Sequence, residues 1–129
     1  CIDMANFGGM DTVPQRYKDA ERLFYEWNPA VTLMRTNAEE NAQMGRVFAE
    51  KANVSTGPMA FLLPLKGVSI LDGDGELFCD READAAFFHA LKAHLRSDIL
   101  VYEVELNIND PAFSARAVEL LLGLMSEGA

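Results

Sequence analysis

An unbroken apolar run near the middle of the chain, Ala60-Phe61-Leu62-Leu63, restricts the fold more than any other segment. No polar residue alternates with the apolar ones, and strands of this kind are buried on both faces, as in a parallel sheet. The run leads into a long polar loop with several glycines that ends at Asp80. In α/β proteins, ligands bind where such strands end. We therefore expect this strand to lie inside a parallel sheet, with a ligand site at its carboxyl end.

Patterns typical of strands and helices alternate along the chain. Thr36 and Glu39 have the spacing of a capping box, which predicts a helix that ends before residue 55. Asp80 is a candidate cap for a second helix, and Asn109-Asp110-Pro111 opens a third. Further strands are expected at residues 1–7, 23–27, 31–35 and 99–106, and it stays open whether the second and third of these are separate. This order predicts right-handed crossovers and an α/β fold with a mainly parallel sheet covered on both faces.

The composition narrows the class of protein. The 129 residues suit one globular unit, and 20 acidic against 11 basic residues give a net charge of -9, which argues against a nucleic-acid partner. Cys1 and Cys79 are too few for a disulfide framework, and no apolar run has the length of a membrane span. We expect a cytoplasmic protein without membrane contact. The chain opens inside a predicted strand and does not begin with Met, which suggests a fragment.

Polar residues and glycines follow each predicted strand. Because the carboxyl ends of parallel strands share one edge of a sheet, the loops after them should meet there. Free N–H groups at helix amino-termini and the charges of Arg35 and Lys66 would favour an anion such as a phosphate, a nucleotide or a carboxylate. We predict a small anionic ligand bound by Asn6, Gly8, Gly9, Arg35, Thr36, Lys66, Gly67, Ser69, Asp72 and Asn109.

The same residues allow other interpretations. Taken singly, Thr36, Asp80 and Asp110 are better explained as caps and turns, whereas the length of the loop that begins at Lys66 favours a ligand role. As an enzyme, an isomerase or a hydrolase, the protein would use Asp72 as base and Lys66 as electrostatic stabiliser. A third possibility is an interaction module without chemistry.

No motif defines a metal centre. The acidic run from Asp72 to Glu76 lacks the full spacing of an EF-hand loop and is better explained as a turn. His89 and His94 are five residues apart and do not share one helix face as the pair of a zinc protease does. We therefore predict no metal ligands.

Five segments carry a family resemblance: Asp3-Met4-Ala5-Asn6-Phe7-Gly8, Thr12-Val13-Pro14, Val31-Thr32-Leu33-Met34-Arg35-Thr36, Leu63-Pro64-Leu65-Lys66-Gly67-Val68-Ser69 and Asn109-Asp110-Pro111-Ala112-Phe113. In this order they resemble the tomato mosaic virus resistance protein family, whose many bacterial and fungal members are often labelled ATP-binding by similarity.

The resemblance implies a protein of two Rossmann-like lobes, and residues 1–129 would be part of one of them, the second half of the second lobe. The fold would then be an incomplete Rossmann-like three-layer sandwich. ATP is a possible cofactor, but its site would lie in the other lobe, and no nucleotide-binding residue can be carried onto this sequence. The partners implied are the remaining lobe of the full-length chain and a possible second copy, because an incomplete lobe leaves one flank of its sheet unpaired.

Overall fold

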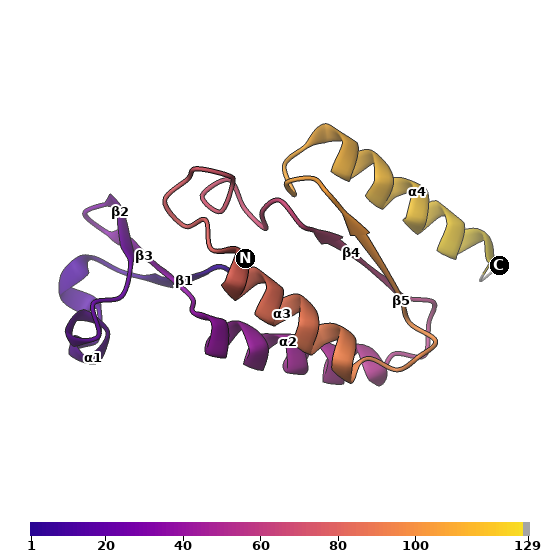
Figure 1. Ribbon diagram of the computed structural model, residues 1–129, viewed down its shortest axis with the longest axis horizontal. Helices are drawn as coiled ribbons and strands as arrows, with labels where there is room; N and C mark the ends of the chain where they lie inside the picture. Colours follow the sequence, from indigo (N-terminus) through magenta and orange to yellow (C-terminus); the bar gives the residue numbers. More distant parts are fainter. Residues whose placement is uncertain (128–129) are drawn as a thin grey trace.

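The computed structural model describes residues 1–127 (Figure 1). Short elements come first, and longer helices alternate with strands in the second part of the chain. In chain order the elements are β1 (Met4–Phe7), the short 3-10 helix η1 (Met10–Thr12), α1 (Gln15–Asp19), β2 (Phe24–Asn28), β3 (Val31–Arg35), α2 (Ala38–Asn53), β4 (Ala60–Pro64), α3 (Arg81–His94), β5 (Leu100–Val104) and α4 (Pro111–Glu127).

Within the described residues, these strands form two separate sheets. One is antiparallel with the order β1-β3-β2, and the other is the parallel pair of β4 and β5, in which Ala60 lies opposite Leu100. The antiparallel sheet lies at one end of the molecule, whereas α2 and α3 lie on the opposite side of the parallel pair from α4 (Figure 1). The molecule is therefore a mixed α/β structure.

The first three strands do not join a parallel sheet, contrary to expectation. Only Pro29 and Ala30 separate β2 from β3. A connection this short joins antiparallel strands, because a parallel pair needs a crossover of about a dozen residues or more. Residues 24–28 and 31–35 are accordingly separate strands of a hairpin, with Tyr25 opposite Leu33. The parallel arrangement predicted for Ala60–Leu63 is confirmed for its pairing with β5 alone.

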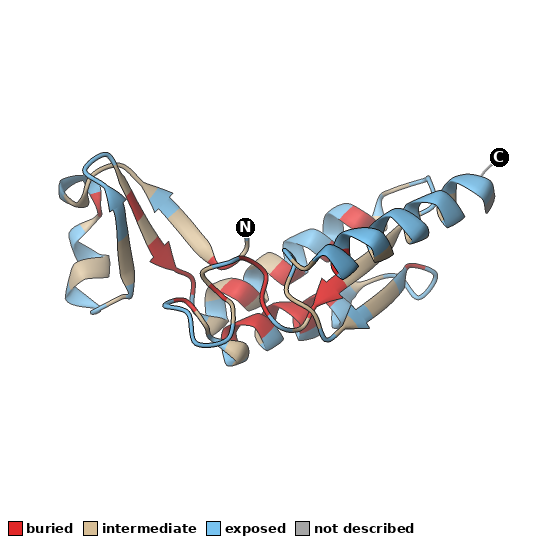
Figure 2. Ribbon diagram, turned by 90° about the horizontal axis from the view of Figure 1, so that it is seen from above, coloured by how far each residue is buried: buried red, intermediate tan, exposed pale blue. Residues whose placement is uncertain are grey.

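The core lies between the parallel pair and the helices α2 and α3. Gly45 of α2 approaches α3 so closely that a Cβ atom there would lie 2.5 Å from the backbone O of Phe87. The buried core cluster consists of Ala49, Leu63, Val68, Phe87, Phe88 and Leu91. In Figure 2 the buried residues gather in this central part, while α4 is largely exposed. On α4, Phe113 is buried as its apolar stripe predicts, but Leu121 is 57% exposed.

Side-chain caps begin the long helices. Asn37, not Thr36, caps α2, because its side chain accepts the N–H of Glu40 while the Glu40 carboxylate accepts the N–H of Asn37. The predicted capping box is therefore wrong by one residue. Asp80 accepts the N–H of Ala83 at the start of α3, which confirms that cap. No helix in residues 1–127 has the length and apolar character needed to cross a membrane.

Candidate functional site

Arg35, the last residue of β3, is the centre of a buried charged network. The residue is 4% exposed, and its Nη2 lies 2.7 Å from Asp84 Oδ1 and 3.1 Å from Asp72 Oδ1. Its Nε donates to the backbone O of Phe78 at 2.8 Å, and its Nη1 contacts the Thr36 hydroxyl at 3.4 Å. Every nitrogen of the guanidinium is thus used inside the protein. Arg35 therefore links parts of the protein to one another, and its guanidinium is not free to bind an anion.

Arg81 supplies a second positive charge at the start of α3. Its Nη1 lies 2.9 Å from Asp84 Oδ2 and 3.4 Å from Asp72 Oδ2, and its Nη2 lies 2.8 Å from Asp74 Oδ1. The two buried carboxylates therefore face two guanidinium groups. Opposite charges and hydrogen bonds of this kind offset the cost of removing carboxylates from water.

Asp72 holds the loop after β4 from the inside. Its side chain is fully buried, its Oδ2 accepts the N–H of Val68 at 2.8 Å, and its own N–H donates to the Ser69 hydroxyl. The pKa of Asp72 is raised to about 6, mainly because burial disfavours the charged carboxylate. The hydrogen bond from Val68 and the charge of Arg35 lower the pKa, whereas the neighbouring Asp84 raises it further. A structural role accounts for this inaccessible carboxylate, and its predicted role as a catalytic base stays a prediction.

The loops after the two parallel strands are tied to each other and to the start of the chain. Ser69 Oγ donates to Asp3 Oδ2 at 2.5 Å, and Asn107 Nδ2 donates to the backbone O of Ser69 at 2.9 Å. Gly67 has a φ of +128°, and a Cβ atom there would lie 2.9 Å from the backbone O of Asp72. Glycine is therefore required at this position.

Several residues predicted for the ligand site do meet. Arg35 contacts Thr36 and Asp72, Asp72 contacts Ser69, and Gly67 lies against Asp72. The Thr36 hydroxyl donates to the backbone O of Ile2 at 2.7 Å. The polar groups of these residues are hydrogen-bonded inside the protein. The cluster of Arg35, Thr36, Gly67, Ser69 and Asp72 therefore forms a support beneath the loop after β4.

Asn6, Gly8 and Gly9 lie away from this cluster, which corrects the expected shared edge. β1 runs antiparallel to β3, so the amino end of β1 and not its carboxyl end lies beside Arg35. Asn6 is exposed and pairs with Leu33, farther along the antiparallel sheet. Gly9 lies against the backbone of Pro29 in the hairpin turn. The prediction that these loops meet assumed that all the strands are parallel. Because β1 is antiparallel to β3, Asn6, Gly8 and Gly9 lie outside the predicted site.

Lys66 and Asn109 lie on neighbouring loops and are both exposed. The N–H of Lys66 donates to the backbone O of Leu106 at 3.1 Å, and the N–H of Ile108 donates to the backbone O of Gly67 at 2.9 Å. The N–H of Asn109 donates to Asn107 Oδ1. The loops that follow β4 and β5 thus lie side by side, as predicted for a parallel pair.

A hollow of about 420 Å³ lies at these carboxyl ends. Its walls are mostly apolar, and Ser69 and Asn109 contribute polar groups. It is lined by Cys1, Met4, Val68, Ser69, Ile70, Leu71, Ile108 and Asn109. A mostly apolar hollow with a few polar groups is the usual form of a small-molecule site.

Sequence reasoning missed three charged residues that contact this support: Asp3, Arg81 and Asp84. The position of Asp84 carried a usable signal, because it falls on the same helix face as Phe88 and Leu91, which are buried. A carboxylate on an apolar face requires a buried positive partner. Asp3 gave no such signal. One of its carboxylate oxygens has no hydrogen-bond partner within residues 1–127.

Together these features define a mixed α/β domain in which a buried network of arginine and aspartate lies beneath the loop after β4. The model of the C-terminal domain of the uncharacterised protein family UPF0261 matches residues 1–125. The chain therefore belongs to the UPF0261 family.

The relatives include bacterial and plant proteins. The chain is 41% identical over 127 residues to a UPF0261 protein of Clostridium tetani and 50% identical over 119 residues to one of Rhizobium meliloti, covering 98% and 91% of this chain. It is 35% identical over 123 residues, 94% of this chain, to the ToMV resistance protein Tm-1 of Solanum lycopersicum. The matches span 31%, 29% and 16% of these relatives, so the chain spans about a third or less of their length. The predicted resemblance to the tomato proteins is confirmed.

Proposed function

We propose that this chain is the ligand-binding part of a Rossmann-like lobe and that it holds a small anionic molecule, phosphorylated or carboxylated, at the carboxyl ends of β4 and β5. The observation that carries this proposal is the hollow of about 420 Å³ between the loops after these two strands. Ligands of α/β proteins bind at this end of the strands.

The residues divide into ligand-facing groups and supporting groups. Lys66 is exposed on the loop that lines the hollow and offers a positive charge, and Asn109 lines the hollow itself. Asp110 caps α4 and its side chain already accepts the N–H of Ala112, so the positive charge in this proposal comes from Lys66. Arg35 and Asp72 act beneath them by fixing the loop, which keeps the ligand-facing groups in place before a ligand arrives.

An assay of thermal stability on the full-length protein tests this proposal. Inorganic phosphate, ATP and citrate serve as probes, because a compound that binds the folded state raises its melting temperature. We expect at least one probe to raise the melting temperature, and we expect Lys66→Ala to abolish that increase.

The matched control is Lys92→Ala. Lys92 is also a surface lysine, but it lies in α3 and not on the loop after β4, and it pairs with Glu103 at 2.6 Å. This variant should respond to the probe as the unchanged protein does. The proposal is wrong if no probe raises the melting temperature, or if Lys66→Ala responds as fully as Lys92→Ala.

A further inference from the structure

β4 has a neighbour on one side only among the described strands. It pairs with β5, and no other strand of residues 1–127 joins that sheet. The N–H of Leu65 donates to the backbone O of Val104, so the peptide groups of Leu65, Leu63 and Phe61 point toward β5. Because directions alternate along a strand, the peptide groups of Ala60 and Leu62 point toward the opposite edge. This is the open edge of β4.

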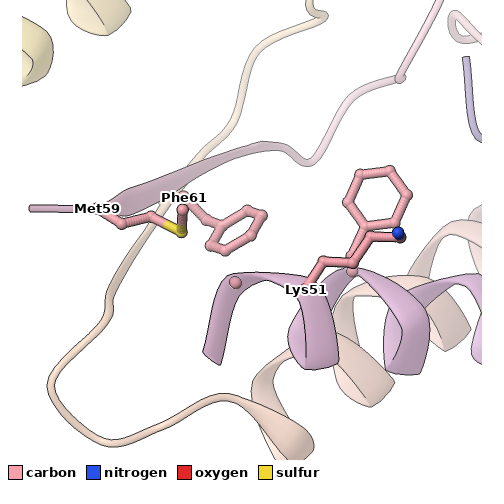
Figure 3. Close-up of a pocket in the computed structure, with 5 residues that line it drawn as sticks. Lys51, Met59 and Phe61 are labelled. Atoms are coloured by element: carbon pink, nitrogen blue, oxygen red, sulfur yellow. The ribbon is translucent and has the colours of Figure 1, made fainter. Parts of the chain in front are cut away.

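Apolar cavities lie on both sides of the open edge. On the side of α2 and α3, a cavity of about 360 Å³ is bordered by Phe48, Phe61 and Phe87. An adjoining cavity of about 260 Å³ is shown in Figure 3, where Met59 and Phe61 face Lys51 of α2. On the side of α4, a cavity of about 190 Å³ lies between Leu62 and Leu120. A strand laid along β4 would direct alternate side chains into the two sides.

The family supplies a candidate for the missing neighbour. Residues 1–125 match a C-terminal domain, and the chain spans 31% and 29% of two bacterial relatives, so most of each relative lies outside the matched region. A segment in the same polypeptide has a high effective concentration at the edge, whereas a second copy must be recruited from solution.

We propose that the open edge of β4 binds an extended segment from the part of the full-length chain that precedes this domain. The segment is apolar on both faces and uncharged, because the cavities on the two sides are lined mainly by apolar side chains. Its pairing ends before Pro64, which lacks an N–H and whose backbone O already accepts the N–H of Gly67. This proposal does not depend on the ligand proposed above.

Photo-crosslinking in the full-length protein tests the proposal. Phe61 is replaced by the photoreactive phenylalanine analogue p-benzoylphenylalanine, and the crosslinked peptides are identified by mass spectrometry. We expect an intramolecular crosslink to an apolar segment that precedes this domain in the full-length chain. Crosslinks confined to residues 1–129, or to a second copy of the chain, would overturn the proposal.

A control variant and a measurement on the unmodified protein keep the proposal testable if the Phe61 variant misfolds. The same replacement at Trp27, which is 63% exposed on the antiparallel sheet, should not crosslink to that segment. Hydrogen exchange on the unmodified full-length protein then compares Leu62, whose N–H faces the open edge, with Leu63, whose N–H faces β5. We expect the two rates to agree within about tenfold, and exchange at Leu62 that is faster by about 100-fold or more contradicts a neighbouring strand.

Discussion

At the scale of single residues, Asp72 shows what it costs to bury a carboxylate beneath a loop. Its pKa of about 6 lies above the ordinary value of 3.8, mainly because burial disfavours the charged form. Between these two pH values the folded protein holds a proton that the unfolded chain releases. The free energy of unfolding contributed by Asp72 therefore falls as the pH rises from about 4 to about 6.

Replacing Asp72 by asparagine should flatten this pH dependence. Asp72→Asn cannot titrate, so its free energy of unfolding should fall less between pH 4 and pH 6 than that of the unchanged protein, as measured by urea denaturation at several pH values. Glu40 acts in the opposite direction, because Arg22 lowers its pKa, but it is present in both proteins and cancels in the difference. Equal slopes in the two proteins would contradict the raised pKa of Asp72.

The sequence predicted the meeting of these residues better than their roles. Arg35, Thr36, Ser69 and Asp72 were expected together, and they are. Their expected partner was a ligand, which stays a prediction, and inside the protein Arg35 contacts Asp84 and Ser69 contacts Asp3. Asp84 follows Asp72 by a loop and a helical turn, and Asp3 depends on the antiparallel pairing of β1. Neither contact follows from local spacing, because both depend on how distant segments pack.

At the scale of elements, the crossing of α2 and α3 depends on the missing side chain of Gly45. A methyl group there would lie 2.5 Å from the backbone O of Phe87 and 2.9 Å from Ala90 Cβ. Neither atom is the end of a flexible side chain, so the helices would have to move apart.

Two glycine replacements in helices should therefore have opposite effects. Gly45→Ala should lower the free energy of unfolding by about 1–3 kcal/mol, the usual cost of overpacking a core. A Cβ atom at Gly123 in α4 meets no atom of residues 1–127 within 4 Å, and Gly123→Ala should raise the free energy of unfolding by about 0.5–1 kcal/mol, because alanine is the better helix former. Thermal denaturation of both variants measures the shifts. A stabilised Gly45→Ala variant would show that the close crossing is not needed.

The elements themselves were largely predictable, and their partners were not. β3 matches its predicted bounds, and the caps at Asp80 and Asp110 are confirmed, since these signals are local. The strand pairing was wrong for β1, β2 and β3, although the turn of Pro29 and Ala30 was short enough to indicate a hairpin. The prediction applied the strand-helix alternation of the later part of the chain to the earlier part as well. There the helix α1 is too short to serve as a crossover between parallel strands.

At the scale of the whole molecule, the Arg35 network joins two structural parts. Arg35 belongs to the antiparallel sheet, whereas Asp72 and Asp84 belong to the part built from the parallel pair and its helices. A buried charge that loses its partner costs about 3–5 kcal/mol. Removal of Arg35 should therefore weaken both the overall stability and the coupling between these parts.

Arg35→Met tests this coupling with two optical signals. Trp27 is the only tryptophan and packs edge-on against Tyr25 in the antiparallel sheet, so its fluorescence reports on that sheet, whereas far-UV circular dichroism reports mainly on the helices. In the unchanged protein we expect both signals to change at the same urea concentration. In Arg35→Met, the Trp27 signal should change at a lower concentration than the helical signal.

The control for this experiment is Arg116→Met. Arg116 forms an exposed pair with Glu119 one helical turn away, and such pairs contribute about 0–1 kcal/mol. Its two transitions should stay coincident and close to those of the unchanged protein. Coincident transitions in Arg35→Met as well would show that the sheet is coupled to the rest by other contacts.

The loop between β4 and α3 also has a consequence for protein engineering. Its conformation depends on Arg35 from an earlier strand, Asp84 from the following helix and Asp3 from the start of the chain. Transplanting the loop alone into another scaffold would leave Asp72 buried without a counter-charge. A successful graft must carry the arginine and the helical aspartate with it, so the smallest portable unit is a set of separated segments and not a continuous stretch of sequence.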